Sequence, residues 1–108
     1  MHIEIRHDDT IKAGEEVRTH IRATLEDVLA RFAEHITSVE VHLADENHEK
    51  KGGDDVRVTV QVKFEGRPAT AVTHHASDLY ISVDSAAEKM ARSLEHQLGR
   101  ARDSMHRA

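Results

Sequence analysis

The sequence predicts a single α+β domain in which one strand, one helix, three strands and a second helix follow in order. Two observations lead to this fold class: apolar and polar residues alternate in four short segments, and apolar residues recur every three or four positions in two longer ones. Because each predicted strand has one apolar face, both helices are expected to cover the same side of a four-stranded sheet. The first helix joins two strands, so a right-handed crossover is expected there.

The first strand is predicted around Ile3 and Ile5, whose neighbours in the chain are polar. A helix of about five turns is predicted from Glu15 to Glu34, with Gly14 as its N-cap. Its apolar residues share one helical face, and they are Val17, Ile21, Leu25, Val28, Leu29 and Phe32.

Three further strands are predicted in the middle of the chain. The second carries Val39, Val41 and Leu43 on one face, and the polar segment 44–54, with its Gly52-Gly53 pair, is expected to be a loop. The third strand, 56–64, is the clearest, because five apolar residues alternate there with polar ones. A tight turn over 65–68 leads into a fourth strand at about 69–75.

The final helix is expected to start after Ser77 as its N-cap, with Asp78 in its first turn. Its apolar positions keep helical spacing, and they are Leu79, Val83, Ala86, Ala87, Met90, Leu94, Leu98 and Ala101. The domain is therefore predicted to span residues 1–103, with 104–108 as a C-terminal tail.

Composition excludes several classes of protein. With 108 residues, 38% of them hydrophobic, the chain suffices for one small core. No apolar run approaches the roughly 20 residues that cross a bilayer, so no membrane partner is expected. There is no cysteine, which excludes disulfides and thiolate chemistry, and the N-terminus lacks a signal-peptide pattern, so a cytoplasmic protein is expected. The net charge is −5, with ten histidines.

The sequence contains no recognisable motif of an enzyme active site. Phosphate-binding loops, nucleophile elbows and dinucleotide fingerprints are absent from the sequence, so no enzyme, cofactor or small-molecule substrate is expected. Two sets of residues have spacing that suggests a metal site, namely His42, Asp45 and His48, and the pair His74-His75. Adjacent residues on a strand point to opposite faces, so the pair cannot share an ion without distortion. We expect surface histidines and no metal.

The last helix carries a basic stripe. At about 100° per residue, Lys89, Arg92, His96 and Arg100 fall within roughly 80° of arc, and Arg107 continues the series. These five residues are the candidate RNA-binding residues, with Lys and Arg contacting phosphates. A purely solubilising role, with Glu88 and Arg92 paired one turn apart, remains the alternative. Base stacking on the sheet is excluded, because two of the three aromatic residues, Phe32 and Phe64, share the parity of the core.

The start of this helix resembles a known family. The segment 77–84, followed by Glu88-Lys89-Met90-Ala91-Arg92 and Leu94, is similar to the final helix of the ribosome hibernation-promoting factors. These are bacterial ribosome-associated translation inhibitors, also called sigma-54 modulation proteins. The matching positions are Asp78, Leu79, Tyr80, Val83, Asp84, Lys89, Met90 and Arg92. The resemblance implies a fold like that of double-stranded-RNA-binding domains with an added strand.

The resemblance also implies a function. Members of this family lie in the mRNA and tRNA channel of the small ribosomal subunit, contact rRNA phosphates with basic side chains and silence translation under stress. At this length the chain resembles the short form, expected to be a monomer that binds the small subunit and its rRNA. The alternative is a protein-interaction module of the same fold that does not bind the ribosome and uses its open sheet face or acidic loop.

Overall fold

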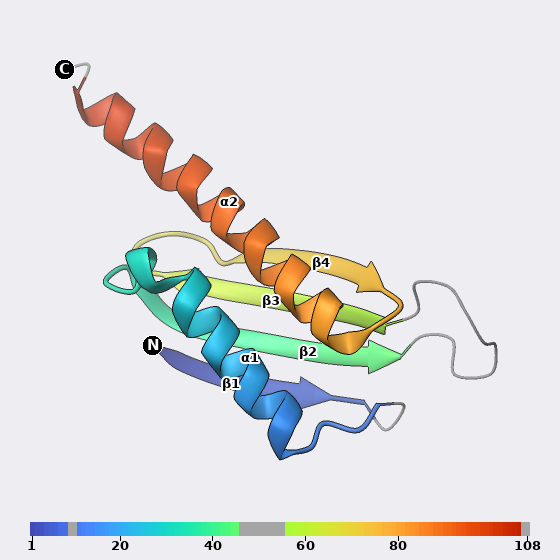
Figure 1. Cartoon of the computed structure of the whole chain (residues 1–108). Helices are drawn as coiled ribbons and strands as arrows, with labels where there is room; N and C mark the ends of the chain where they lie inside the picture. The colour runs from blue at the N-terminus through green and yellow to red at the C-terminus, as the bar shows by residue number, and fades with distance from the viewer. Residues whose placement is uncertain (9–10, 46–55, 107–108) are drawn as a thin grey trace.

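A four-stranded mixed sheet forms one layer of the molecule, and two helices form the other (Figure 1). The computed structural model describes residues 1–8, 11–45 and 56–106, with side chains described up to Leu98. The elements are β1 (His2–His7), α1 (Glu15–Val28), a 3₁₀ turn η1 (Ala30–Phe32), β2 (Ile36–Asp45), β3 (Val56–Phe64), β4 (Thr70–Ala76) and α2 (Leu79–His106). The predicted fold class and element order are confirmed.

The strands lie in the order β1-β2-β3-β4, with β1 parallel to β2 and the other pairs antiparallel. Helix α1 makes the crossover between the two parallel strands, and Figure 1 shows both helices on the same face of the sheet. One row of the register runs from Ile5 through Val41 and Val60 to Val72. These side chains share the parity that faces the helices, as the alternation predicts.

The core lies between the sheet and the two helices. Helix α1 contributes Ile21 and Leu25, and α2 contributes Met90 and Leu94, all of them at most 1% exposed. The sheet contributes the inward residues of its two central strands, mainly Val39, Val41, Leu43, Val58, Val60 and Val62. The buried set matches the apolar faces read from the sequence, because burial of those faces is what holds each element against its neighbours.

Helix α1 ends earlier than predicted. The α-helix stops at Val28, and Leu29 leaves helical geometry with φ −99° and ψ 8°. The chain then tightens into η1, where the amide of Phe32 donates to the carbonyl of Leu29 at 3.0 Å. This tighter turn keeps both Leu29 and Phe32 buried while the chain redirects toward β2. Gly14 is the N-cap of α1, as predicted.

Other element ends also differ from the predictions. Strand β2 continues to Asp45, so the first two residues expected in the loop belong to the strand, and 46–54 lie outside the described residues. Strand β4 is displaced by one residue, to Thr70–Ala76. Helix α2 begins at Leu79, and its N-cap is Asp78 rather than Ser77: the amide of Ile81 donates to Asp78 Oδ1 at 3.1 Å. A carboxylate there satisfies a free amide and complements the helix dipole.

Helix α2 is much longer than the sheet is wide, and its C-terminal part extends past the other elements (Figure 1). Its 28 residues correspond to about 42 Å at 1.5 Å per residue. The last residue of α2 packed against the core, among those with described side chains, is Leu98. The domain boundary at residue 103 stays a prediction. No helix in the described ranges has a stretch long and apolar enough to cross a membrane.

Candidate nucleic-acid interface

The side chains of the basic stripe that the structure describes all face solvent. Lys89, Arg92 and His96 are exposed on α2, on the opposite side from Met90 and Leu94. Arg100 belongs to a part of α2 in which only the backbone is described, and Arg107 lies outside the described residues. Solvent exposure of these three side chains is necessary for phosphate binding, and the binding role of the stripe stays a prediction.

Lys89 lies along the side of α2 that faces β4. Its Nζ donates to the backbone carbonyl of Thr73 at 2.9 Å. Strand β4 is an edge of the sheet, so this contact gives a partner to a carbonyl on that strand. An ammonium group has three N–H donors, which leaves two of them for an external acceptor such as a phosphate. At Lys89, the basic stripe therefore lies beside the free edge of the sheet.

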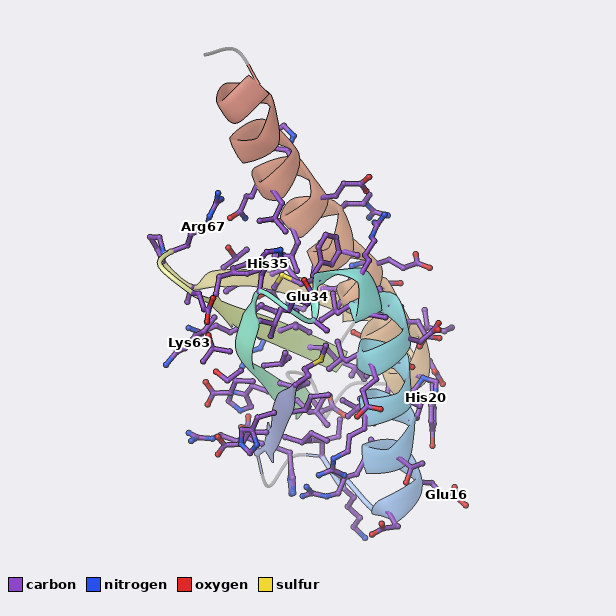
Figure 2. All side chains as sticks on the ribbon, turned by 90° about the vertical axis from the view of Figure 1, so that its left-hand side faces the viewer. Glu16, His20, Glu34, His35, Lys63 and Arg67 are labelled. Carbon is purple, nitrogen blue, oxygen red and sulfur yellow. The ribbon has the colours of Figure 1, made fainter. Side chains whose placement is uncertain are left out.

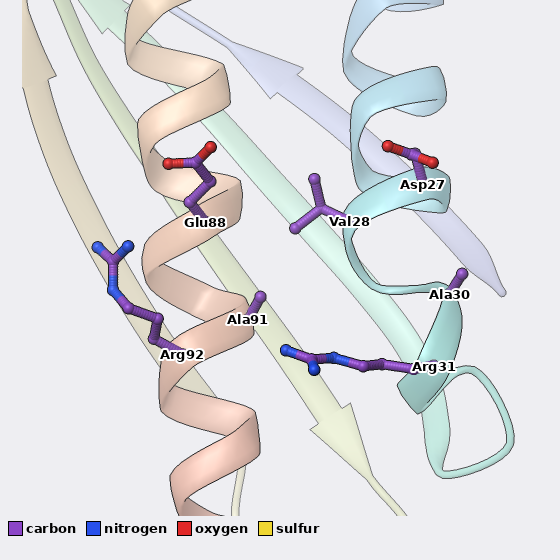
Figure 3. A pocket seen from close by; sticks show the side chains of 7 residues that line it. All are labelled: Asp27, Val28, Ala30, Arg31, Glu88, Ala91 and Arg92. Carbon is purple, nitrogen blue, oxygen red and sulfur yellow. The ribbon is translucent and has the colours of Figure 1, made fainter.

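Arg92 makes no hydrogen bond or ion pair with any described residue, so the Glu88–Arg92 pair that the spacing allows is not formed. Figure 3 shows Arg92 on one side of α2, with Ala91 on the side that faces α1. A guanidinium group that is exposed and has no carboxylate partner keeps its full charge and all five donors for a phosphate.

A groove of about 450 Å³ separates α1 from α2 (Figure 3). Arg31 and Glu95 bridge it with an ion pair at 3.0 Å, and a second contact joins His20 Nε2 to Asp84 Oδ1 at 2.8 Å. The charged side chains that line the groove and its continuation toward the start of α2 are Asp27, Asp84, Glu88, Arg31 and Arg92. Because Glu95 neutralises Arg31, Arg92 is the one lining arginine without a carboxylate partner among the described residues, and it faces three carboxylates. This balance makes the groove less favourable for a nucleic-acid backbone than a surface of uncompensated cations.

The open face of the sheet carries mixed charge. Arg6 forms ion pairs with Glu4 at 3.0 Å and with Glu40 at 3.2 Å. The hydrogen bond and the charge of Glu4, followed by the charge of Glu40, raise the pKa of Arg6 above its ordinary value. His42 is hydrogen-bonded to Asp8 at 2.8 Å. Arg6 and His42 already have anionic neighbours, so this face attracts a polyanion less than the basic stripe does.

Of the two histidine sets considered for metal binding, the first is described only in part. His42 contacts Asp8, and His48 lies outside the described residues. In β4, His74 is half-buried on the helix side while His75 is exposed on the open face, which confirms that the two point in opposite directions. Within the described part of the chain, no group of three or more His, Cys, Asp or Glu side chains could hold an ion.

The structure brings one cation to the basic stripe that the sequence reading missed. Arg67 lies in the turn between β3 and β4, next to Gly66, whose φ of 68° suits glycine in a tight turn. Its Nη1 donates to the carbonyl of Gln97 in α2 at 3.5 Å, and Figure 2 shows the side chain reaching from the turn toward α2. The contact joins residues 30 positions apart, so helical spacing carried no signal for it.

Comparison with known proteins identifies the family. The family model described as sigma 54 modulation protein / S30EA ribosomal protein matches residues 3–102. Comparison with curated proteins gives no match. Among solved structures, the N-terminal domain of Protein Y from Thermus thermophilus superposes with a TM-score of 0.71 at 19% identity, covering 89% of this chain and 98% of that chain.

A ribosomal subunit interface protein from Coxiella burnetii superposes with a TM-score of 0.76 at 16% identity, covering 92% of this chain and 99% of that chain. At these identities the superpositions show a shared fold, and the family match shows the relationship. The predicted resemblance is thereby confirmed: over nearly its whole length, this chain belongs to the sigma-54 modulation protein / S30EA ribosomal protein family.

Proposed function

We propose that this protein is a cytoplasmic, ribosome-associated translation regulator without enzymatic activity. It binds the small ribosomal subunit as a monomer, contacts rRNA phosphates in the channel used by mRNA and tRNA, and silences translation under stress. The observation that carries the proposal is the family match over residues 3–102. The fold is also shared with a protein described as a ribosomal subunit interface protein.

The basic stripe supports a phosphate-binding role for α2. Lys89, Arg92 and His96 project from one side of a helix whose opposite side is fixed in the core, so their positions are set by the fold. Arg100 and Arg107 continue the series in the sequence. Each cation that neutralises a phosphate releases counterions, which makes binding depend steeply on salt. No base-specific contact is required, since phosphates and RNA shape provide the binding surface.

Co-sedimentation with purified small subunits at low and high salt tests this proposal. The key variant is Lys89→Glu/Arg92→Glu, which reverses the two cations of the stripe closest to the body of the domain. The matched control is Lys12→Glu/Arg22→Glu, which makes the same charge change at two exposed positions away from the stripe. We expect the wild-type protein and the control to co-sediment at low salt and to dissociate at high salt, and the key variant to bind far more weakly.

The outcomes separate phosphate binding from a protein-interaction role. Binding to small subunits that does not change with salt indicates a protein surface as the contact, and contradicts the role of the stripe. If no salt condition gives co-sedimentation, the domain is a protein-interaction module of the same fold. Equal losses in the key variant and the control show that overall charge matters and that the stripe has no special position.

A further inference from the structure

The cations of this domain divide into two groups according to their partners. Arg31 and Arg6 are neutralised by ion pairs with Glu95, Glu4 and Glu40. Lys89, Arg92 and Arg67 have no carboxylate partner among the described residues. Lys89 and Arg67 instead donate to backbone carbonyls, which leaves their charge uncompensated. Lys12, Arg18, Arg22 and Lys63, on other parts of the surface, also have no carboxylate partner among the described residues. Lys89, Arg92 and Arg67 lie on α2 and in the turn that packs against it.

Arg67 extends the stripe where α2 itself lacks cations. Between His96 and Arg100 the helix carries Gln97, Leu98 and Gly99. The Arg67 guanidinium donates to the carbonyl of Gln97, so a cation from another element lies at this level of the helix. From Lys89 to Gln97 is eight residues, or about 12 Å along the axis, a length that spans several phosphates of one RNA strand.

Hydrogen bonds hold the turn that carries Arg67 against α2, next to the basic stripe. Gln97 Nε2 donates to Thr70 Oγ1 at 3.0 Å and lies 3.2 Å from Ser93 Oγ. Thr70 is the first residue of β4 and follows the turn directly. These contacts hold the base of the turn against α2, so less conformational entropy is lost when Arg67 binds a ligand. In the sequence, the carboxylate residue nearest to Arg67 is Glu65, two positions before it.

The other exposed side of the helix pair is unsuitable for RNA. Its outward residues are mostly acidic, and they include Glu15, Glu16, Glu26, Asp27, Asp84 and Glu88. A phosphate backbone laid along the groove between α1 and α2 meets these carboxylates and Arg92, which lines the groove. One laid beside β4 meets Lys89 and Arg67, with no printed carboxylate contact at either cation. Lys63 also belongs to the β3–β4 hairpin, but Figure 2 shows it pointing away from α2.

We propose that Arg67 is a phosphate-binding residue of the same interface as the basic stripe, so that the RNA backbone crosses α2 and the β3–β4 turn rather than the groove between the helices. This inference rests on the proposed function and specifies its surface. It assigns a site residue outside α2, and it predicts the side of the molecule that faces rRNA.

The test compares Arg67→Gln with Arg22→Gln, because both remove one charge from an exposed arginine and Arg22 lies on the acidic α1 side. Affinity for small subunits is measured by fluorescence anisotropy of labelled protein over a range of salt concentrations. Loss of one phosphate contact lowers the slope of log affinity against log salt by about 0.7 to 0.9, which at 0.1 M salt is about a five- to eightfold loss of affinity. We expect this loss for Arg67→Gln, little change for Arg22→Gln, and recovery in Arg67→Lys.

Thermal melts of all variants confirm that the fold is intact, since Arg67 is exposed and its one hydrogen bond is long. If the wild-type protein binds and Arg67→Gln behaves like Arg22→Gln, the role of Arg67 is wrong while the proposed function stands. A greater loss in Arg22→Gln places the RNA on the helix pair and also overturns the inference. If the wild-type protein does not bind at any salt concentration, the proposed function fails and this inference fails with it.

Discussion

Ser82 links α2 to the sheet through a buried hydroxyl group, and its removal has a calculable effect. Ser82 is 0% exposed, and it is the only polar residue classed as buried in the described part of the chain. Its Oγ lies 3.1 Å from the carbonyl of His74 and 3.3 Å from the carbonyl of Val56, within donating distance of both. Ser82→Ala removes this donor with minimal change in volume, so its effect on stability reports the hydrogen bond.

The magnitude follows from a comparison with Ser85→Ala. Ser85 is on the same helix, is only partly buried and has no hydrogen-bond partner for its side chain among the described residues. Both changes gain about 0.5 kcal/mol of helix propensity, which cancels in the difference. What remains is the loss of the buried hydroxyl's hydrogen bonding to the two carbonyls, about 1–2 kcal/mol of the free energy of unfolding.

Thermal unfolding followed by circular dichroism measures this difference. An unfolding entropy of about 2.1 cal/mol/K per residue over 108 residues makes 1 kcal/mol equal to about 4 °C. Ser82→Ala is therefore expected to melt about 4 to 9 °C below Ser85→Ala. Equal melting temperatures refute the reasoning, because they show that apolar packing alone holds α2 on β3 and β4.

Three further predictions concern other positions. Asp78→Ala removes the acceptor of the Ile81 amide and should lower the free energy of unfolding, measured by denaturant titration, by about 1 kcal/mol. Ser77→Ala should lower it less. A larger loss in Ser77→Ala than in Asp78→Ala contradicts Asp78 as the N-cap. Gly66 has a φ of 68°, and a β-carbon added there would meet no neighbouring atom, so Gly66→Ala should lose about 1–2 kcal/mol of the free energy of unfolding from backbone strain alone. Gly66→Asn should lose less. Unchanged stability of the alanine variant contradicts a positive φ at this residue. Lys89→Glu/Arg92→Glu should stay within about 1 kcal/mol of the wild-type stability because both side chains are exposed, and an unfolded variant shows that the basic stripe is structural.

Residue patterns along the chain were sufficient for the fold and for part of the candidate site. Alternation in β3 and helical spacing in α2 each place every residue on one of two faces, and burial of the apolar face then fixes which side of the sheet the helices cover. The same periodicity placed Lys89, Arg92 and His96 on the solvent side of α2, where the structure has them. The family motif around Asp78 and Tyr80 lies within one helix and was therefore also visible in the sequence.

Contacts between distant parts of the chain required the three-dimensional structure. The bond from Lys89 to Thr73, the position of Arg67 beside Gln97 and the neutralisation of Arg31 by Glu95 each join residues from different elements. The end of α1 at Val28 also required the three-dimensional structure, because burial of Leu29 and Phe32 in the shared core overrides the local helical pattern. Periodicity reports which face of an element a residue occupies, whereas the packing of one element on another decides which charges meet there.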